Sequence, residues 1–319
     1  MSTTTSSARN GKGNTVNSAS GASKALSEMT PQELRKLSKR GQGGFNKRTF
    51  GSWAWLIIIL VAAIAWISPL YLAFVNSVKS TTEYDTTGPL SLPTYIDFNN
   101  IIHFWNKANF TEKLWNSFQI SFFVAILGVL ISFLTAYAIG IGKIRGRFWI
   151  LALFMVAFTI PGEALMYPLL RMMKMIGLYD NIYSLVIIFS VLLSAFGTYL
   201  LSSVLSDFPT ELLEAAKIDG AGSFRLLRSV VFPLTRPTLL VLMVFFFIWT
   251  WNEFLLPLVM LPSNSSQTVS LSMGLASGQY TSEPTQQAAA ALVGILPTLL
   301  FFLIFQRTLL KGVTMGSVK

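Results

Sequence analysis

The stretch Trp55-Leu-Ile-Ile-Ile-Leu-Val61 is continuously apolar and lies inside a longer apolar run at residues 53–75. About 20 apolar residues in a helix cross the roughly 30 Å hydrocarbon core of a bilayer. A strand of a closed barrel would instead alternate apolar and polar residues over shorter segments. The polar tail at 1–49 precedes the run and no small-residue cleavage site ends it, so it does not read as a signal peptide. The run predicts a transmembrane helix that stays in the protein.

Five further stretches have membrane-crossing length, and we place them at 114–141, 148–170, 182–204, 238–261 and 288–305. The composition agrees, because 52% of the 319 residues are hydrophobic and 12% are charged, whereas soluble domains have about 25% charged residues. These values exclude a soluble enzyme and a disordered regulator, and the absence of cysteine excludes a disulfide scaffold. We expect an all-α polytopic protein in which six transmembrane helices form one domain at 50–319.

The positive charges orient this bundle. Outside the expected spans, 19 Lys and Arg residues lie on the side that holds both termini and the loop at 205–235, and 5 lie on the other side. Cytoplasmic loops carry the excess of Lys and Arg, so we expect cytoplasmic N- and C-termini. The net charge of +10 then reflects topology and the lipid bilayer rather than nucleic acid. The tail at 1–49 is expected to be basic and partly disordered, with a surface-lying helix or a partner contact as the alternatives.

The loop at 205–235 is long for a polytopic protein and has its own pattern of helix signals. Gly220 and Gly222 are expected to stop a first short helix, Ser223 to cap a second, and Pro233 to end that second helix at the membrane. Long loops with their own structure are usually functional. The loop therefore predicts a docking element.

This loop resembles the EAA loop of binding-protein-dependent ABC importer permeases, with Val and Phe in place of the usual Ile and Leu. The matching residues are Glu214, Ala215, Ala216, Gly220, Val230, Phe232 and Pro233. The segments 214–220, 251–254, 306–307 and 312–316 are similar to the carbohydrate branch of that family, the maltose- and glycerol-phosphate-type permeases. The resemblance covers residues 53–319 and leaves out the tail.

The resemblance implies a type I ABC importer permease in a bacterial or archaeal cell (inner) membrane. It would translocate a sugar or oligosaccharide delivered by an extracytoplasmic binding protein. The implied partners are a second homologous permease and two ATPase subunits, which bind ATP and Mg, while this chain holds no cofactor. Glycerol phosphate or a polyol is the alternative solute, and an ion-coupled secondary transporter is a more distant one.

The same resemblance assigns an ATPase-coupling set within the loop. Glu214 would be an anchoring acid, although ordinary helix-start electrostatics is an alternative explanation for it. The small side chains of Ala215 and Ala216 would fit a narrow cleft, and Gly220 would permit a sharp turn. Asp219 and Pro233 complete the set, and the tail at 314–319 resembles family tails that reach the ATPase interface.

Enzyme chemistry has little support in this sequence. His103 is the only histidine and cysteine is absent, so a multi-histidine or cysteine metal site is excluded. No phosphate-binding G-x-x-x-x-G-K-[ST] loop occurs. We expect a transport subunit without a catalytic or metal site, whose energy comes from a partner that hydrolyses ATP.

Ionisable residues inside spans are functional candidates because an unpaired charge in lipid is costly. Glu163 follows Pro161-Gly162, where we expect a break, and Glu253 lies beside aromatic and amide side chains. Five residues are therefore candidates for the translocation path: Trp249, Trp251, Asn252, Glu253 and Glu163. The alternative is that 251–254 is a packing and kink element whose Asn bonds backbone carbonyls. The polar outside loop at 262–287 is either a contact with the binding protein or a connector.

Overall fold

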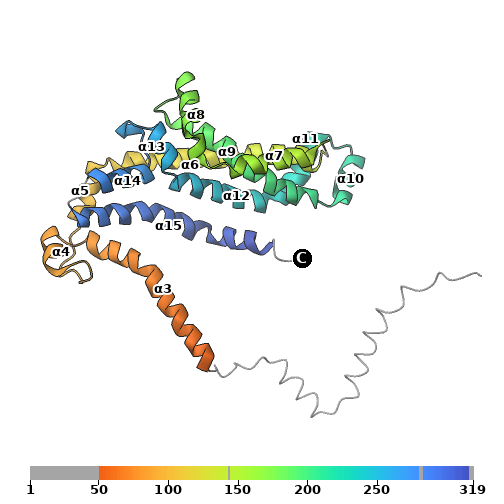
Figure 1. The fold of residues 1–319 in the computed structure, drawn as a ribbon. Helices are drawn as coiled ribbons and strands as arrows, with labels where there is room; N and C mark the ends of the chain where they lie inside the picture. Colours follow the sequence, from red (N-terminus) through yellow and green to blue (C-terminus); the bar gives the residue numbers. More distant parts are fainter. Residues whose placement is uncertain (1–49, 143, 280–282, 316–319) are drawn as a thin grey trace, which may run out of the picture. The chain divides into compact units, whose positions relative to one another are not determined.

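The computed structural model describes residues 50–142, 144–279 and 283–315. They belong to two units, one ending at Ser68 and one beginning at Pro69, which we describe separately. All regular elements in the described ranges are helices, which confirms the all-α prediction (Figure 1). The tail at 1–49 and residues 316–319 are not among the described residues. The predictions made for them therefore stay predictions.

Five helices are long and apolar enough to span a membrane, and a bent pair brings the number to six among the described residues. The spanning helices and the pair are α3 (Phe50–Ser77), α6 (Phe110–Gly140), α9 (Ile182–Ser206), α12 (Phe232–Asn252), α15 (Pro284–Met315), and α7 (Arg147–Thr159) with α8 (Gly162–Met175). The pair bends by 93° between Thr159 and Gly162. This bend confirms the predicted break at Pro161-Gly162. It forms there because proline has no N–H to donate to a helical hydrogen bond.

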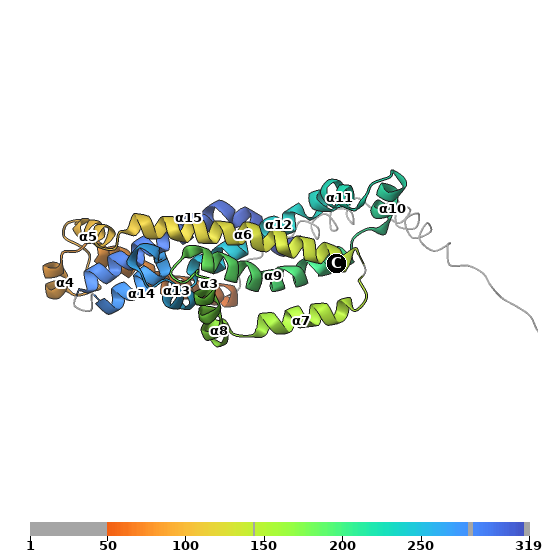
Figure 2. The ribbon, with the colours of Figure 1, turned by 90° about the horizontal axis from the view of Figure 1, so that it is seen from above.

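Short elements connect these helices. They are α4 (Thr81–Thr87), α5 (Asn99–Lys107), α10 (Thr210–Ile218), α11 (Ser223–Leu226), the π-helical η1 (Leu227–Val231), α13 (Leu255–Met260), the 3₁₀ turn η2 (Asn264–Ser266) and α14 (Val269–Gln279). In the second unit, α10 and α11 lie at one end of the bundle and α4, α5 and α14 lie at the opposite end (Figures 1 and 2).

The first unit contains the start of α3, whose apolar sequence continues into the second unit. Within the second unit, α6 and α9 form the most extensively packed pair. Small residues allow this close approach, because a Cβ atom on Gly197 would lie 2.3 Å from the Ser132 Oγ and 2.9 Å from the Phe246 ring. Phe246, on α12, also lies against Gly128 and is completely buried. These small-residue contacts replace the hydrophobic effect, which does not drive helices together in lipid.

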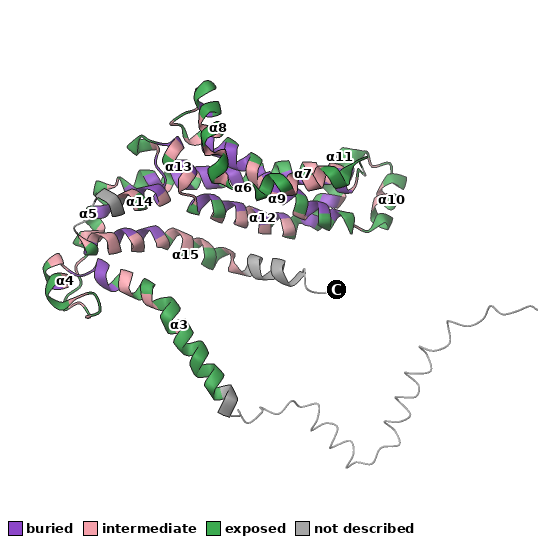
Figure 3. Ribbon diagram, viewed as in Figure 1, coloured by how far each residue is buried: buried purple, intermediate pink, exposed green. Residues whose placement is uncertain are grey.

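Burial follows this arrangement (Figure 3). The facing sides of α6, α9 and α12 are buried, whereas their other sides expose large apolar residues such as Leu130 and Val191. Exposed apolar side chains suit a surface bathed in lipid or covered by another membrane subunit.

The fifth span differs from its predicted bounds of 238–261. Helix α12 begins at Phe232 and ends at Asn252, after which Glu253 and Phe254 leave the helix before α13 starts. Pro233 was expected to end a helix, but it lies in the first turn of α12. The helix does not end there, because α11, η1 and α12 form one continuous helical stretch from Ser223 to Asn252. The π turn of η1, whose last bond joins the Phe232 N–H to the Leu227 carbonyl, accommodates the proline. The expected cap at Ser223 is also wrong, since Gly222 is the capping residue and provides no side-chain bond.

Candidate functional site

Helix α10 projects from one end of the bundle and has no buried residue (Figures 1 and 3). Leu213 and Ala216 are half-buried and pack against the hydrophobic core of the second unit. Glu214 and Ala215 are exposed. Of the two alanines in the predicted coupling set, Ala215 is thus the one available to a partner, while Ala216 seats the helix on the bundle.

The turn after α10 depends on glycine. Gly220 has a φ of 74°, a left-handed conformation that residues with a Cβ adopt at a cost. The Gly220 N–H donates to the Lys217 carbonyl at 3.0 Å and the Ala221 N–H donates to the Ala216 carbonyl at 2.9 Å. These bonds satisfy the last carbonyls of α10 in the manner of a Schellman cap. Asp219 occupies the cap position itself.

A hydrogen bond that sequence reasoning missed ties this loop to the core. The Tyr137 hydroxyl, near the end of α6, donates to the Ser223 carbonyl oxygen at 3.1 Å. The two residues are 86 positions apart, so no local signal in the sequence pairs them.

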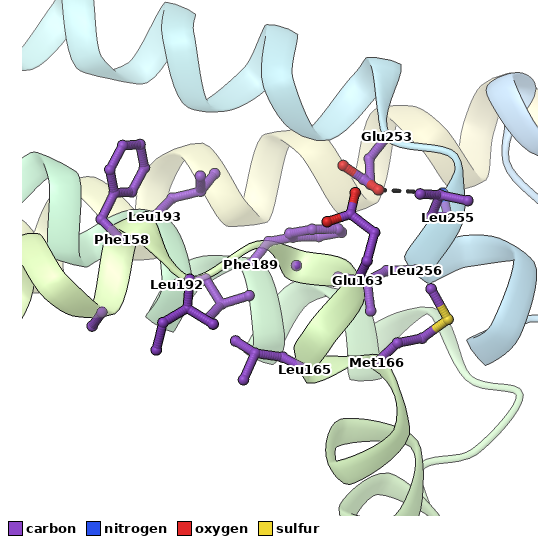
Figure 4. A pocket seen from close by; sticks show the side chains of 13 residues that line it. Phe158, Glu163, Leu165, Met166, Phe189, Leu192, Leu193, Glu253, Leu255 and Leu256 are labelled. Carbon is purple, nitrogen blue, oxygen red and sulfur yellow. Dashed lines mark hydrogen bonds between the residues drawn. The ribbon is translucent and has the colours of Figure 1, made fainter.

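Two predicted path residues meet at the breaks in the third and fifth spans. Glu163 lies in the first turn of α8 and Glu253 caps α12. Figure 4 shows their carboxylates pointing toward one another in a pocket of about 180 Å³ whose other lining side chains are apolar, Phe189 and Leu256 among them. The Glu253 Oε1 also accepts a hydrogen bond from the Leu255 N–H at 3.2 Å. Among the described residues that line this pocket, none is a cation.

Asn252 and Trp251 line a different and larger cavity, of about 570 Å³, between α12, α14 and α15. The Asn252 Nδ2 donates to the Ile248 carbonyl at 2.7 Å, as the kink interpretation expects. The Ser270 Oγ donates to the Trp251 carbonyl at 2.7 Å. Trp249 lines neither cavity and packs its ring 5.2 Å from that of Phe196. The five candidate path residues therefore divide between two cavities and an aromatic cluster.

At the opposite end of the bundle, α6 holds the turn before α14. Lys113 is fully buried, and its Nζ donates to the Asn264 carbonyl and, at 2.8 Å, to the Asn264 Oδ1. The Asn116 Nδ2 donates to the Ser265 carbonyl at 2.6 Å and the Gln267 carbonyl at 3.1 Å. This part of the outer loop is therefore anchored to the bundle.

Asp180, in the connection before α9, holds the same turn from another side. It accepts hydrogen bonds from the Ser263 N–H at 3.2 Å, the Ser263 hydroxyl, and the Ser266 hydroxyl at 2.5 Å. Partial burial would raise the pKa of this carboxyl, but the bonds from Ser263 and Ser266 outweigh it and hold the pKa below its ordinary value. No cluster of three metal-ligating side chains occurs among the residues that the structure describes.

Comparison with known proteins identifies membrane components of transport systems as similar to this chain. Residues 128–313 match the family described as "Binding-protein-dependent transport system inner membrane component". The chain is 32% identical, over 82% of its length and 94% of the relative's, to a probable starch degradation products transport system permease protein, AmyC, of Thermoanaerobacterium thermosulfurigenes. It is 29% identical to the sn-glycerol-3-phosphate transport system permease protein UgpE of Yersinia enterocolitica, over 80% and 93% of the two chains.

A solved structure shares the fold. It is a bacterial ABC transporter involved in the import of the acidic polysaccharide alginate, with a TM-score of 0.62 and 24% identity over 82% of this chain and 98% of that one. A second structure, of the alginate transporter in complex with a periplasmic protein bound to an alginate pentasaccharide, has a TM-score of 0.56 and 16% identity, over 81% of this chain and 96% of that one.

Proposed function

The chain belongs to the family of binding-protein-dependent transport system inner membrane components, and from this premise we propose that it is a permease subunit of an ABC importer for a sugar or oligosaccharide. Its relatives include permeases named for starch degradation products, arabinooligosaccharides and trehalose. They are transport subunits and not enzymes, so the energy for transport comes from a separate ATPase.

The observation that carries this proposal is the exposed helix α10 with its glycine turn, inside the matched family region. We assign Glu214, Ala215, Asp219 and Gly220 to ATPase coupling, with Ala216 seating the helix. Pro233 lies near the start of α12, the helix through which α10 movements would enter the bundle. Two ATPase subunits would bind ATP and Mg, and a second homologous permease would complete the path. The C-terminal tail at 314–319 would contact the same ATPase.

In this assignment the α10 end of the bundle is cytoplasmic, along with both termini. The Lys and Arg distribution supports that orientation. The opposite end, with α4, α5 and α14, is then extracytoplasmic, and its anchored turn at 263–267 would present a defined surface to the binding protein. A rigid turn loses little conformational entropy when a partner docks on it.

The cavities at the break in the fifth span are the candidate translocation path. The carboxylates of Glu163 and Glu253 accept hydrogen bonds from hydroxyl groups, and a sugar offers many such donors. Asn252 and Trp251 line the neighbouring cavity with an amide and an aromatic face, groups that suit a carbohydrate. Trp249 lines neither cavity, so we assign it a packing role in its aromatic cluster and not a contact with the solute.

Glycerol phosphate is the second candidate solute, because UgpE is among the relatives. A phosphate needs Lys, Arg or backbone N–H donors. The described lining of both cavities contains no Lys or Arg, and one cavity contains two carboxylates. This composition favours a neutral sugar.

The proposal is tested by copurification and uptake. A tagged chain expressed with its own importer should bring down a second permease and an ATPase present in two copies. Proteoliposomes of that complex should accumulate sugar only with ATP and the loaded binding protein. A chain that moves solute alone on an ion gradient would overturn the proposal, and a panel of sugars and glycerol phosphate tested on the binding protein separates the two solutes.

A further inference from the structure

Helix α10 has an outward face that the packing of the loop defines. Leu213 and Ala216 turn toward the core, so the residues on the opposite side of the helix point away from the bundle. Positions spaced by three, four and seven residues share one side of a helix. The outward residues are Glu211, Glu214, Ala215 and Ile218, and all four are exposed.

Ile218, the large apolar residue on this face, has 86% of its surface accessible. Phe224, on the other side of the Gly220 turn, is 73% exposed, although Leu226 in the same short helix is buried. Helices α10 and α11 contact each other, and the hydrogen bond from Tyr137 to the Ser223 carbonyl fixes α11 against α6. The large apolar side chains of Ile218 and Phe224 are thus exposed on an ordered loop that connects two spans.

A lipid surface is a poor explanation for this exposure. Between Thr210 and Gly220 the chain carries three carboxylates, of Glu211, Glu214 and Asp219, and one cation, Lys217. The cytoplasmic leaflet is negatively charged and attracts basic segments. Arg225 and Arg228 follow Phe224, so the acidic character is confined to α10. The outward face of α10, with Glu211 and Glu214, is repelled by that leaflet and attracted to a partner with positive charge.

We propose that Ile218 and Phe224 are the apolar anchors of the interface with the ATPase subunit. This inference rests on the proposed function and deepens it by naming anchors outside the Glu-Ala-Ala pattern. The partner surface is a cleft with an apolar floor that receives the two side chains and a basic rim that pairs with Glu211 and Glu214. Interfaces of this kind have a few buried anchors inside a polar rim.

Asp substitutions test the anchors in the assembled importer. Ile218→Asp and Phe224→Asp should each lower the amount of ATPase that copurifies with the full chain by about tenfold, with normal recovery of the second permease. Ile218→Val and Phe224→Leu keep an apolar side chain and should recover ATPase within about twofold of the wild type. Normal ATPase recovery with both Asp variants overturns the inference alone. A wild-type chain that recovers no ATPase overturns the proposed function as well.

Crosslinking provides a test that does not depend on folding of the Asp variants. The chain contains no cysteine, so Ile218→Cys and Phe224→Cys each introduce a single reactive thiol. A thiol-to-amine crosslinker should join both variants to the ATPase in the intact complex. Phe148→Cys is the matched control, because Phe148 is 70% exposed at the start of α7, and it should give no ATPase adduct. The inference is wrong if the Ile218 and Phe224 thiols crosslink no more than that control.

Discussion

Tyr137 of α6 donates its hydroxyl hydrogen to the carbonyl oxygen of Ser223, 3.1 Å away. This bond joins the core of the bundle to the first residue of α11, beside the proposed ATPase contact. Helix α6 is also packed along α9 and α12. We expect a displacement of the α10–α11 loop to reach the central helices through this bond.

Replacing Tyr137 with Phe should weaken that connection without disturbing packing. A hydrogen bond contributes a net 0.5 to 1.5 kcal/mol, roughly a two- to tenfold change in an equilibrium. We expect sugar transported per ATP hydrolysed to fall by about that factor, while ATPase copurification is retained. Tyr199→Phe is the control, because that exposed tyrosine of α9 has no side-chain hydrogen bond to any residue that the structure describes. Equal coupling in both variants would show that the Tyr137 bond transmits nothing.

Gly220→Val should uncouple transport through the backbone alone. No atom lies within 4 Å of an added Cβ, so the cost comes from the φ of 74°, about 1–2 kcal/mol for a residue with a side chain. Uptake should fall several-fold with the protein still in the membrane. Gly222→Val is the matched control, since Gly222 has a φ of −67° and the same open space. A similar loss in both variants would contradict this role for Gly220.

Much of the fold was predictable because lipid imposes a simple rule on span length and polarity. The break at Pro161-Gly162 was also predictable, since proline removes a helical hydrogen bond. The break at Glu253 was predicted only as an alternative, in which 251–254 is a packing and kink element, because Asn252 and Glu253 could equally be polar residues of a continuous span. Pro233 misled the prediction because a π turn at 227–231 lets the helix continue through the proline, and the sequence gives no sign of that turn.

The site was predictable only where a pattern of spacing existed. That pattern predicted Glu214 and Gly220 as coupling residues, whereas an apolar residue such as Ile218 is interpreted as a packing residue in any sequence. The contact of Lys113 with Asn264 joins residues 151 positions apart. Such pairs arise from how the helices assemble, and a single sequence carries no periodicity that reveals them.

Gly197→Leu should destabilise the chain itself. Its side chain would collide with Ser132 and with the Phe246 ring, because even a Cβ atom would lie 2.3 Å from the Ser132 Oγ. Overpacking of a core typically costs about 1–3 kcal/mol, so we expect a lower midpoint of thermal unfolding in detergent. Gly162→Ala, which adds an atom into open space, should leave the midpoint unchanged. An unchanged midpoint for Gly197→Leu would mean that the α6–α9 contact is looser than described.

The turn held by Asp180 should be insensitive to pH across the neutral range. Its pKa in the folded chain lies below the ordinary value of 3.8 because of the hydrogen bonds from Ser263 and Ser266. The ionised Asp180 therefore stabilises the turn fully above pH 3.8. This stabilisation is lost as the pH falls through the pKa of Asp180 in the folded chain, which lies below 3.8. Hydrogen exchange of the amides at 263–269 should show constant protection from about pH 5 to 8. Asp180→Asn should reduce that protection at every pH, and a wild-type midpoint above pH 5 would contradict the assignment.

The facing carboxylates of Glu163 and Glu253 make the sharpest prediction about the solute. If both accept hydrogen bonds from sugar hydroxyls, Glu163→Gln and Glu253→Gln each remove a charged acceptor, whose bond contributes about 1.5–3 kcal/mol. Uptake should then require roughly ten- to a hundredfold more loaded binding protein for half-maximal rate. ATPase copurification should be unaffected because no residue of α10 is among those that line the pocket. Asp85→Asn, at an exposed acid in α4, controls for the loss of one charge. Unaltered uptake in the double Gln variant would place the path elsewhere, and the larger cavity beside Asn252 would be the next candidate.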